Sequence, residues 1–246
     1  MMKKKIKDVF VNYIRYGNEE GDDVVLLHGW GQNIAMMQPI GNALQKEFNV
    51  TIVDLPGYGE SEEPKYPWEV SDYVECIKEL LDELKIDNPV LIGHSFGGKI
   101  SLLYASMYNV EKMILFGSPF KREIEKLSMK TKMLKSLKKV PVLNKLEGFA
   151  KKHIGSEDYR KASDMMRQIL VKTVNLDITE EVKKISCPTL IVWGNLDEAV
   201  PLERAYELEN LIKDAGVVVY ENCTHYAYLE NLNQTINILY SFLGGK

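Results

Sequence analysis

Residues 89–98 read Pro89-Val90-Leu91-Ile92-Gly93-His94-Ser95-Phe96-Gly97-Gly98. An apolar run leads into the pattern Gly-x-Ser-x-Gly, and a helix-like run over residues 99–108 follows it. A sharp turn from strand to helix lifts a serine hydroxyl above the edge of a sheet, and the glycines allow close backbone packing around it. The helix N-terminus adds free N–H groups and a dipole that favour negative charge. We therefore predict that Ser95 is a nucleophile, provided that the rest of the chain supplies its partners.

Outside this turn, short apolar runs alternate with segments of helical periodicity. The predicted strands cover residues 9–16, 24–27, 50–53, 90–92, 113–116, 189–192 and 217–219. The predicted helices cover residues 34–48, 70–84 and 99–108, a segment that begins near Pro201, and about residues 226–242. Uniformly apolar strands that are separated by helices are typical of a parallel sheet with both faces covered. The predicted fold class is therefore α/β.

Residues 120–185 interrupt this alternation, because they show helical periodicity and no strand signal. We predict a core domain formed by residues 1–119 and 186–246, with residues 120–185 as a helical cap inserted into it. From Lys121 to Lys184 the chain has 17 Lys/Arg and 9 Asp/Glu, a net charge of +8, against a net charge of −12 for the remainder. Such asymmetry indicates either a solvated helical insert or a surface for an anionic partner.

Composition narrows the class of protein. The 246 residues are 45% hydrophobic and 27% charged, which is typical of a soluble globular protein. No apolar run approaches the roughly 18 residues that span a bilayer, and the basic start of the chain lacks the apolar stretch of a signal peptide. Three cysteines are too few for a disulfide framework or a metal cluster. We expect a cytoplasmic protein without a membrane span or a metal, and nucleic-acid binding is disfavoured because no aromatic platform accompanies the basic residues.

Serine needs a general base within hydrogen-bond reach to become a nucleophile. Of the four histidines, His225 follows the last predicted strand, so its loop opens at the same sheet edge as Ser95. Asp197 follows the strand at 189–192 and precedes His225, which gives the chain order Ser, Asp, His that this architecture uses. We predict a triad of Ser95, Asp197 and His225, with Glu198 as the alternative carboxylate.

The developing oxyanion needs hydrogen-bond donors. We assign this role to the backbone N–H of Phe96, directly after the nucleophile, and to that of Trp30 in the sequence His28-Gly29-Trp30-Gly31. The Trp30 ring is expected to line an acyl pocket. In the predicted cap, apolar side chains that are suited to an acyl chain are Met129, Met133 and Leu137.

Other polar residues of the loops are expected to be structural. Asp54 lies in the turn-rich sequence that follows the strand at 50–53, and we interpret it as a buried anchor of that loop. The side chains of His28 and His94 are expected to brace their own turns.

Five collinear segments together resemble the α/β-hydrolase fold superfamily. They are His-Gly-Trp-Gly at 28–31, Asp-Leu-Pro-Gly-Tyr-Gly-Glu-Ser at 54–61, Gly-His-Ser-Phe-Gly-Gly at 93–98, Pro-Thr-Leu-Ile-Val-Trp-Gly-Asn-Leu-Asp at 188–197 and Thr-His-Tyr at 224–226. The resemblance implies an eight-stranded, mostly parallel sheet, a helical cap over residues 120–185 and no cofactor. The tryptophan at position 30 resembles that of carboxylesterases, including the pimeloyl-carrier-protein methyl ester esterases.

We therefore expect a serine hydrolase that cleaves small carboxylic esters through an acyl-enzyme, with an acidic carrier protein as a possible partner at the basic cap. Two alternatives stay open. The same triad serves thioester hydrolases and carbon–carbon bond hydrolases, and some members of the fold are non-catalytic receptors for small ligands.

Overall fold

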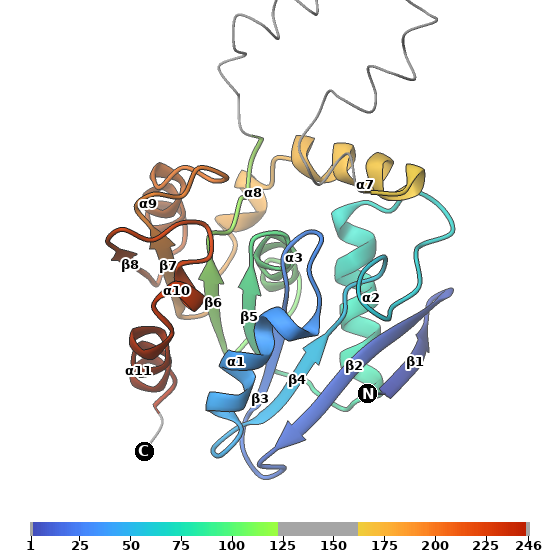
Figure 1. The fold of residues 1–246 in the computed structure, drawn as a ribbon, viewed down its shortest axis with the longest axis horizontal. Coiled ribbons are helices and arrows are strands. Elements are labelled where there is room, and N and C mark those ends of the chain that lie inside the picture. The colour runs from blue at the N-terminus through green and yellow to red at the C-terminus, as the bar shows by residue number, and fades with distance from the viewer. Residues whose placement is uncertain (1, 123–161, 245–246) are drawn as a thin grey trace, which may run out of the picture.

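The computed structural model describes residues 2–122 and 162–244, and within them an eight-stranded sheet forms the centre of the molecule (Figure 1). The strands are β1 (Met2–Ile6), β2 (Val9–Gly17), β3 (Asp23–Leu27), β4 (Asn49–Val53), β5 (Val90–His94), β6 (Lys112–Phe116), β7 (Thr189–Gly194) and β8 (Ala215–Tyr220). Their order across the sheet is β1-β2-β4-β3-β5-β6-β7-β8. The pairings β1–β2 and β2–β4 are antiparallel and all others are parallel. The predicted α/β class with a mostly parallel sheet is confirmed.

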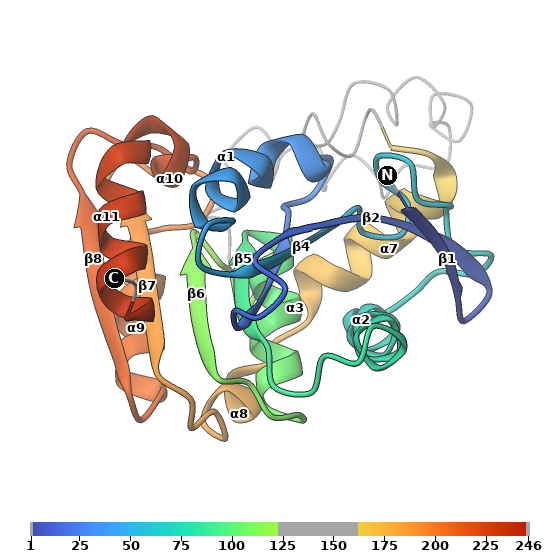
Figure 2. The ribbon, with the colours of Figure 1, turned by 90° about the horizontal axis from the view of Figure 1, so that it is seen from below.

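Helices cover both faces of this sheet. They are α1 (Ile34–Leu44), α2 (Val70–Glu83), α3 (Phe96–Ala105), α7 (Asp164–Asn175), α8 (Thr179–Val182), α9 (Glu203–Leu211), α10 (Ala227–Glu230) and α11 (Leu232–Leu243). Figure 2 shows α1 on one side of the sheet, with α2 and α3 on the other. Successive side chains of a strand point to opposite faces. In β3, accordingly, Val24 and Leu26 join the core under α1 and α11, whereas Val25 and Leu27 join the core under α2 and α3.

Two elements differ from the sequence prediction. β1 carries no strand signal in the sequence, because its residues Lys3, Lys4 and Lys5 look like a simple charge run. This strand forms the sheet edge, where no apolar face is required and lysines discourage pairing with another chain. The predicted C-terminal helix is interrupted at Asn231, which separates α10 from α11.

The predicted cap segment is described only at its two ends. Phe120 is buried in the core, and its carbonyl accepts a 2.9 Å hydrogen bond from the N–H of Ile178, so the outgoing and returning chains meet there. On the return, α7 crosses above α2 at the sheet edge that carries the C-terminal ends of the parallel strands (Figure 1). Lys172 of α7 donates to the backbone oxygen of Pro67 at 2.9 Å. The boundaries of a separate cap stay a prediction.

No helix among the described residues combines the length and the apolar character needed to cross a bilayer.

Candidate active site

Ser95 occupies a strained turn between β5 and α3. Its backbone angles are φ 51° and ψ −111°, a region that costs a non-glycine residue about 1–3 kcal/mol. Two hydrogen bonds hold this turn: the N–H of Ser95 donates to the oxygen of Phe116 at 2.9 Å, and the N–H of Gly97 donates to the oxygen of His28 at 3.1 Å. A Cβ on Gly97 would lie 2.2 Å from the carbonyl oxygen of Leu27. The Gly-x-Ser-x-Gly pattern therefore reflects a need for close packing against the neighbouring strands.

The carboxylate of Asp197 is buried and contacts the partly buried imidazole of His225. Nδ1 of His225 lies 2.7 Å from Oδ2 of Asp197, and the two side chains are 15% and 1% exposed, respectively. The other oxygen, Oδ1, accepts hydrogen bonds of 2.9 Å from the N–H groups of Ala199 and Val200. With Nδ1–H donating to the carboxylate, Nε2 of His225 is left with a lone pair that can accept a proton.

The loop that carries His225 lies against the turn that carries Ser95. The ring centroids of His225 and His94, the residue before the serine, are 4.8 Å apart. Gly117 directly follows Phe116, the residue that accepts from the Ser95 N–H. A Cβ on Gly117 would lie 3.0 Å from Nδ1 of His225. All three predicted triad residues thus lie at the edge formed by the C-terminal ends of the parallel strands.

The predicted oxyanion donors also lie at this edge. The Gly97–His28 hydrogen bond ties the loop after β3 to the serine turn. The Trp30 ring packs on Phe96, with ring centroids 5.4 Å apart, and on Tyr58 at 5.3 Å. Within residues 2–122 and 162–244, neither the N–H of Trp30 nor that of Phe96 donates a hydrogen bond.

His28 and Asp54 serve as structural anchors, as predicted. Nδ1 of His28 donates to the oxygen of Gly29 at 2.7 Å, and Nε2 accepts from the N–H of Leu55 at 3.0 Å. Burial lowers the pKa of His28 to about 4, which keeps its ring neutral. The Asp54 carboxylate accepts from the N–H of Ile34 at 2.7 Å and from Nδ2 of Asn12 at 2.7 Å, which joins its loop to α1 and β2.

Sequence reasoning missed the residues that fix the His225 loop. Glu230 of α10 accepts from the N–H of Thr224 at 2.7 Å and also binds its hydroxyl. Oδ1 of Asn195 accepts from the N–H of Asn222 at 2.8 Å. Gly117 was also missed, although a glycine directly after an apolar strand indicates a turn at the sheet edge where the site lies. Nothing in the sequence marks Glu230, because its partner is known only once α10 is folded against the loop.

A family model for the alpha/beta hydrolase fold matches residues 23–128 and 116–232. The chain belongs to the alpha/beta hydrolase fold family. The hydrolase is 31% identical over 237 residues to the pimeloyl-[acyl-carrier protein] methyl ester esterase of Pseudoalteromonas atlantica, a match that covers 86% of this chain and 90% of that protein. It is 26% identical over 248 residues to the AB hydrolase superfamily protein YisY of Bacillus subtilis, covering 90% and 91% of the two chains.

Solved structures agree with this assignment. The esterase EaEST from Exiguobacterium antarcticum superimposes with a TM-score of 0.78 and 25% identity, covering 99% of each chain. The enol-lactonase from Burkholderia xenovorans shares the fold, with a TM-score of 0.78, 21% identity, and coverage of 99% of this chain and 100% of that one. Together, the named esterases among these relatives support the prediction that this hydrolase belongs to the carboxylic ester hydrolase class.

Three predicted substrate-binding residues of this hydrolase, Met129, Met133 and Leu137, lie outside the described residues. Within the described parts, no group of three or more His, Cys, Asp or Glu side chains could hold a metal ion.

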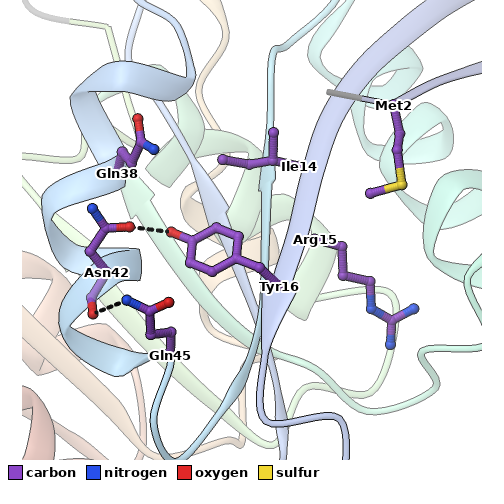
Figure 3. Close-up of a pocket in the computed structure, with 7 residues that line it drawn as sticks. All are labelled: Met2, Ile14, Arg15, Tyr16, Gln38, Asn42 and Gln45. Atoms are coloured by element: carbon purple, nitrogen blue, oxygen red, sulfur yellow. Dashed lines mark hydrogen bonds between the residues drawn. The ribbon is translucent and has the colours of Figure 1, made fainter.

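A surface hollow of about 330 Å³ lies elsewhere, between β2 and α1 (Figure 3). It is lined by Met2, Ile14, Arg15, Tyr16, Gln38, Asn42 and Gln45. In it the Tyr16 hydroxyl donates to Oδ1 of Asn42 at 3.0 Å. None of these seven residues belongs to the loops that carry Ser95, Asp197 and His225, so the hollow is separate from the candidate site.

Proposed function

We propose that the protein cleaves carboxylic esters in two steps through an acyl-enzyme on Ser95, with His225 as general base and Asp197 as its orienting carboxylate. The observation that supports this most strongly is the 2.7 Å contact between His225 and the buried carboxylate of Asp197, beside a strained serine turn. The carboxylate of Asp197 lies within hydrogen-bond distance of the His225 ring, which favours Asp197 over Glu198.

In the first step Oγ of Ser95 attacks the ester carbonyl carbon, and its proton passes to Nε2 of His225. The Asp197 carboxylate stabilises the imidazolium that forms. The carbonyl oxygen becomes an oxyanion and accepts hydrogen bonds from the N–H groups of Phe96 and Trp30. A single donor of this kind is worth about 3–4 kcal/mol in the transition state. The C–O bond of the ester then breaks, and the alkoxide leaves with the proton from His225.

In the second step water replaces the alcohol. His225 takes a proton from the water, the resulting hydroxide attacks the acyl carbon, and the second tetrahedral intermediate collapses to the free acid. The proton returns to Oγ of Ser95 and regenerates the enzyme.

Replacement of the nucleophile tests this mechanism. Ser95→Ala should lower kcat for p-nitrophenyl acetate by at least about 10³-fold and leave the melting temperature near that of the parent. Ser106→Ala, just beyond the other end of α3, is the matched control and should hydrolyse the ester at the parent rate. Parent-like turnover by a folded Ser95→Ala variant would show that the nucleophile is another group.

We further propose that the acyl group is delivered on an acidic carrier protein. Relatives at 31% and 28% identity are named pimeloyl-[acyl-carrier protein] methyl ester esterases, and the segment from Lys121 to Lys184 carries a net charge of +8. Attraction between opposite charges accelerates association and weakens with ionic strength. kcat/KM for a carrier-linked methyl ester should therefore fall steeply with salt, while that for p-nitrophenyl acetate stays constant. Equal salt responses of the two substrates would exclude the carrier.

Hydrolysis of a carbon–carbon bond is the second candidate. A meta-cleavage product hydrolase from Pseudomonas fluorescens superimposes with a TM-score of 0.76 and 25% identity over 99% of this chain. A panel of matched esters, thioesters and vinylogous 1,5-diketones separates these activities, and the ester should have the highest kcat/KM.

We also assign the reaction to the cytoplasm. All three cysteines, Cys76, Cys187 and Cys223, are free thiols, which fits a reducing compartment. Detection of the protein in the soluble fraction of gently lysed cells tests this assignment.

A further inference from the structure

His94 connects three loops of the candidate site through its two ring nitrogens. The side chain is fully buried at the end of β5, directly before Ser95. Nε2 lies 3.1 Å from the backbone oxygen of His225. Nδ1 lies 3.2 Å from Oε1 of Gln32, and the same amide oxygen accepts a 3.1 Å hydrogen bond from the N–H of Gly29. One imidazole therefore links the serine turn, the loop of the proposed base and the loop of the proposed oxyanion donor.

We propose that His94 is a positioning residue for catalysis: its Nε2–H holds the backbone of His225 so that the base stays aligned with Ser95. This inference rests on the proposed function. His94 acts through His225 and has no assigned contact with the substrate. A general base must lie within hydrogen-bond reach of the proton that it removes, so a small displacement of the His225 backbone changes the rate more than it changes substrate binding.

The His225 carbonyl depends on this contact. Among the described residues, no other group donates a hydrogen bond to this oxygen. The rings of His225, Tyr226 and Tyr228 surround His94, with centroid distances of 4.8, 5.3 and 4.9 Å. Removal of the donor therefore leaves this carbonyl without its partner among the described residues.

The imidazole of His94 is neutral, because burial and the nearby His225 lower its pKa to about 3. A neutral ring carries one N–H, so it donates either to the His225 carbonyl or to the Gln32 amide. We place the proton on Nε2, which faces the His225 carbonyl. Oε1 of Gln32 then keeps the N–H of Gly29 as its donor, and its 3.2 Å approach to Nδ1 is a contact without a hydrogen bond. The neutral state also suits the reaction, because His225 becomes positively charged during it and a second cation 4.8 Å away would oppose that charge.

Two amide substitutions separate the two nitrogens of His94. In His94→Gln the terminal NH2 reaches the position of Nε2, whereas in His94→Asn it reaches only the position of Nδ1. We expect His94→Asn to lower kcat for p-nitrophenyl acetate about 10–100-fold with KM unchanged within a factor of two, as a misplacement on the order of 1 Å does. His94→Gln should retain kcat within about fivefold of the parent, at a melting temperature similar to that of His94→Asn.

Equal loss of kcat in the two variants, or parent-like kcat in His94→Asn, would overturn the inference. The first result indicates that the ring only fills space, and the second that the His225 loop needs no such contact. Because Ser95→Ala is measured beside these variants, failure of this inference is distinguishable from failure of the proposed nucleophile.

Discussion

The most specific prediction concerns Gly117, which lies under the pair formed by His225 and Asp197. Its φ is +53°, and an added Cβ would lie 3.0 Å from Nδ1 of His225 and 3.2 Å from Oδ2 of Asp197. Ordinary van der Waals contact begins near 3.4 Å. The added methyl group of Gly117→Ala therefore pushes the side chains of His225 and Asp197 by a few tenths of an ångström. It contacts Nδ1 and Oδ2, the two atoms that form the 2.7 Å hydrogen bond.

Two separate costs follow for Gly117→Ala. The left-handed backbone of an alanine costs about 1–2 kcal/mol, which should appear as a loss of unfolding free energy in urea. Displacement of His225 should lower kcat for p-nitrophenyl acetate by about 10-fold or more, in proportion to the shift of the base.

Gly244→Ala is the matched control. Gly244 has a φ of +82°, and among the described residues, its chain neighbour aside, no heavy atom lies within 4 Å of its added Cβ. This variant carries the backbone cost without the contact, so it should lose stability and keep the parent kcat. If Gly117→Ala also kept the parent kcat, the His225–Asp197 pair could not be the catalytic pair that we propose.

Three further predictions test other parts of the account. Burial lowers the pKa of Lys99 to about 8 from 10.5, while its ammonium donates to two backbone carbonyls at the end of α7. The unfolded chain then binds the proton of the Lys99 ammonium more strongly than the folded chain does, so Lys99 makes the unfolding free energy rise with pH above about 8. Lys99→Met should flatten this rise, which urea titrations at pH 7.5 and 9.5 measure. Asp197→Asn should lower kcat by up to about 10⁴-fold, because the amide favours the wrong tautomer of His225, and a loss below tenfold would contradict its role. Asp54→Ala leaves several donors without an acceptor and should lower the urea unfolding free energy by about 2–4 kcal/mol, whereas an unchanged value would mean that Asp54 does not anchor its loop.

Much of the fold could be predicted because the central strands are buried on both faces. Residues 24–27 and 113–116 are uniformly apolar for that reason, and turn residues follow each of them. The place of the candidate site in the fold could also be predicted from the sequence. Parallel strands end at one edge of a sheet, and the loops with Ser95, Asp197 and His225 come directly after such strands. The predicted pair of Asp197 and His225 is present at hydrogen-bond distance.

The remaining features depend on packing that a single sequence does not encode locally. β1 was missed because an edge strand needs no apolar face. The role of His94 was predicted only as a brace of its own turn, because its contacts to Gln32 and His225 join residues 62 and 131 positions apart in the chain. Glu230 was missed although Thr224 is near in the chain, because the two side chains meet only once α10 is folded against the loop.

Active-site labelling shows whether the hydroxyl of Ser95 is activated as a nucleophile. The protein is incubated with a fluorophosphonate, and the intact mass and the labelled peptide are measured by mass spectrometry for the parent, Ser95→Ala and His225→Ala. We expect one adduct on Ser95 in the parent, none in Ser95→Ala and strongly slowed labelling in His225→Ala. Ester hydrolysis by a parent protein that forms no adduct, or an adduct at another residue, would contradict it.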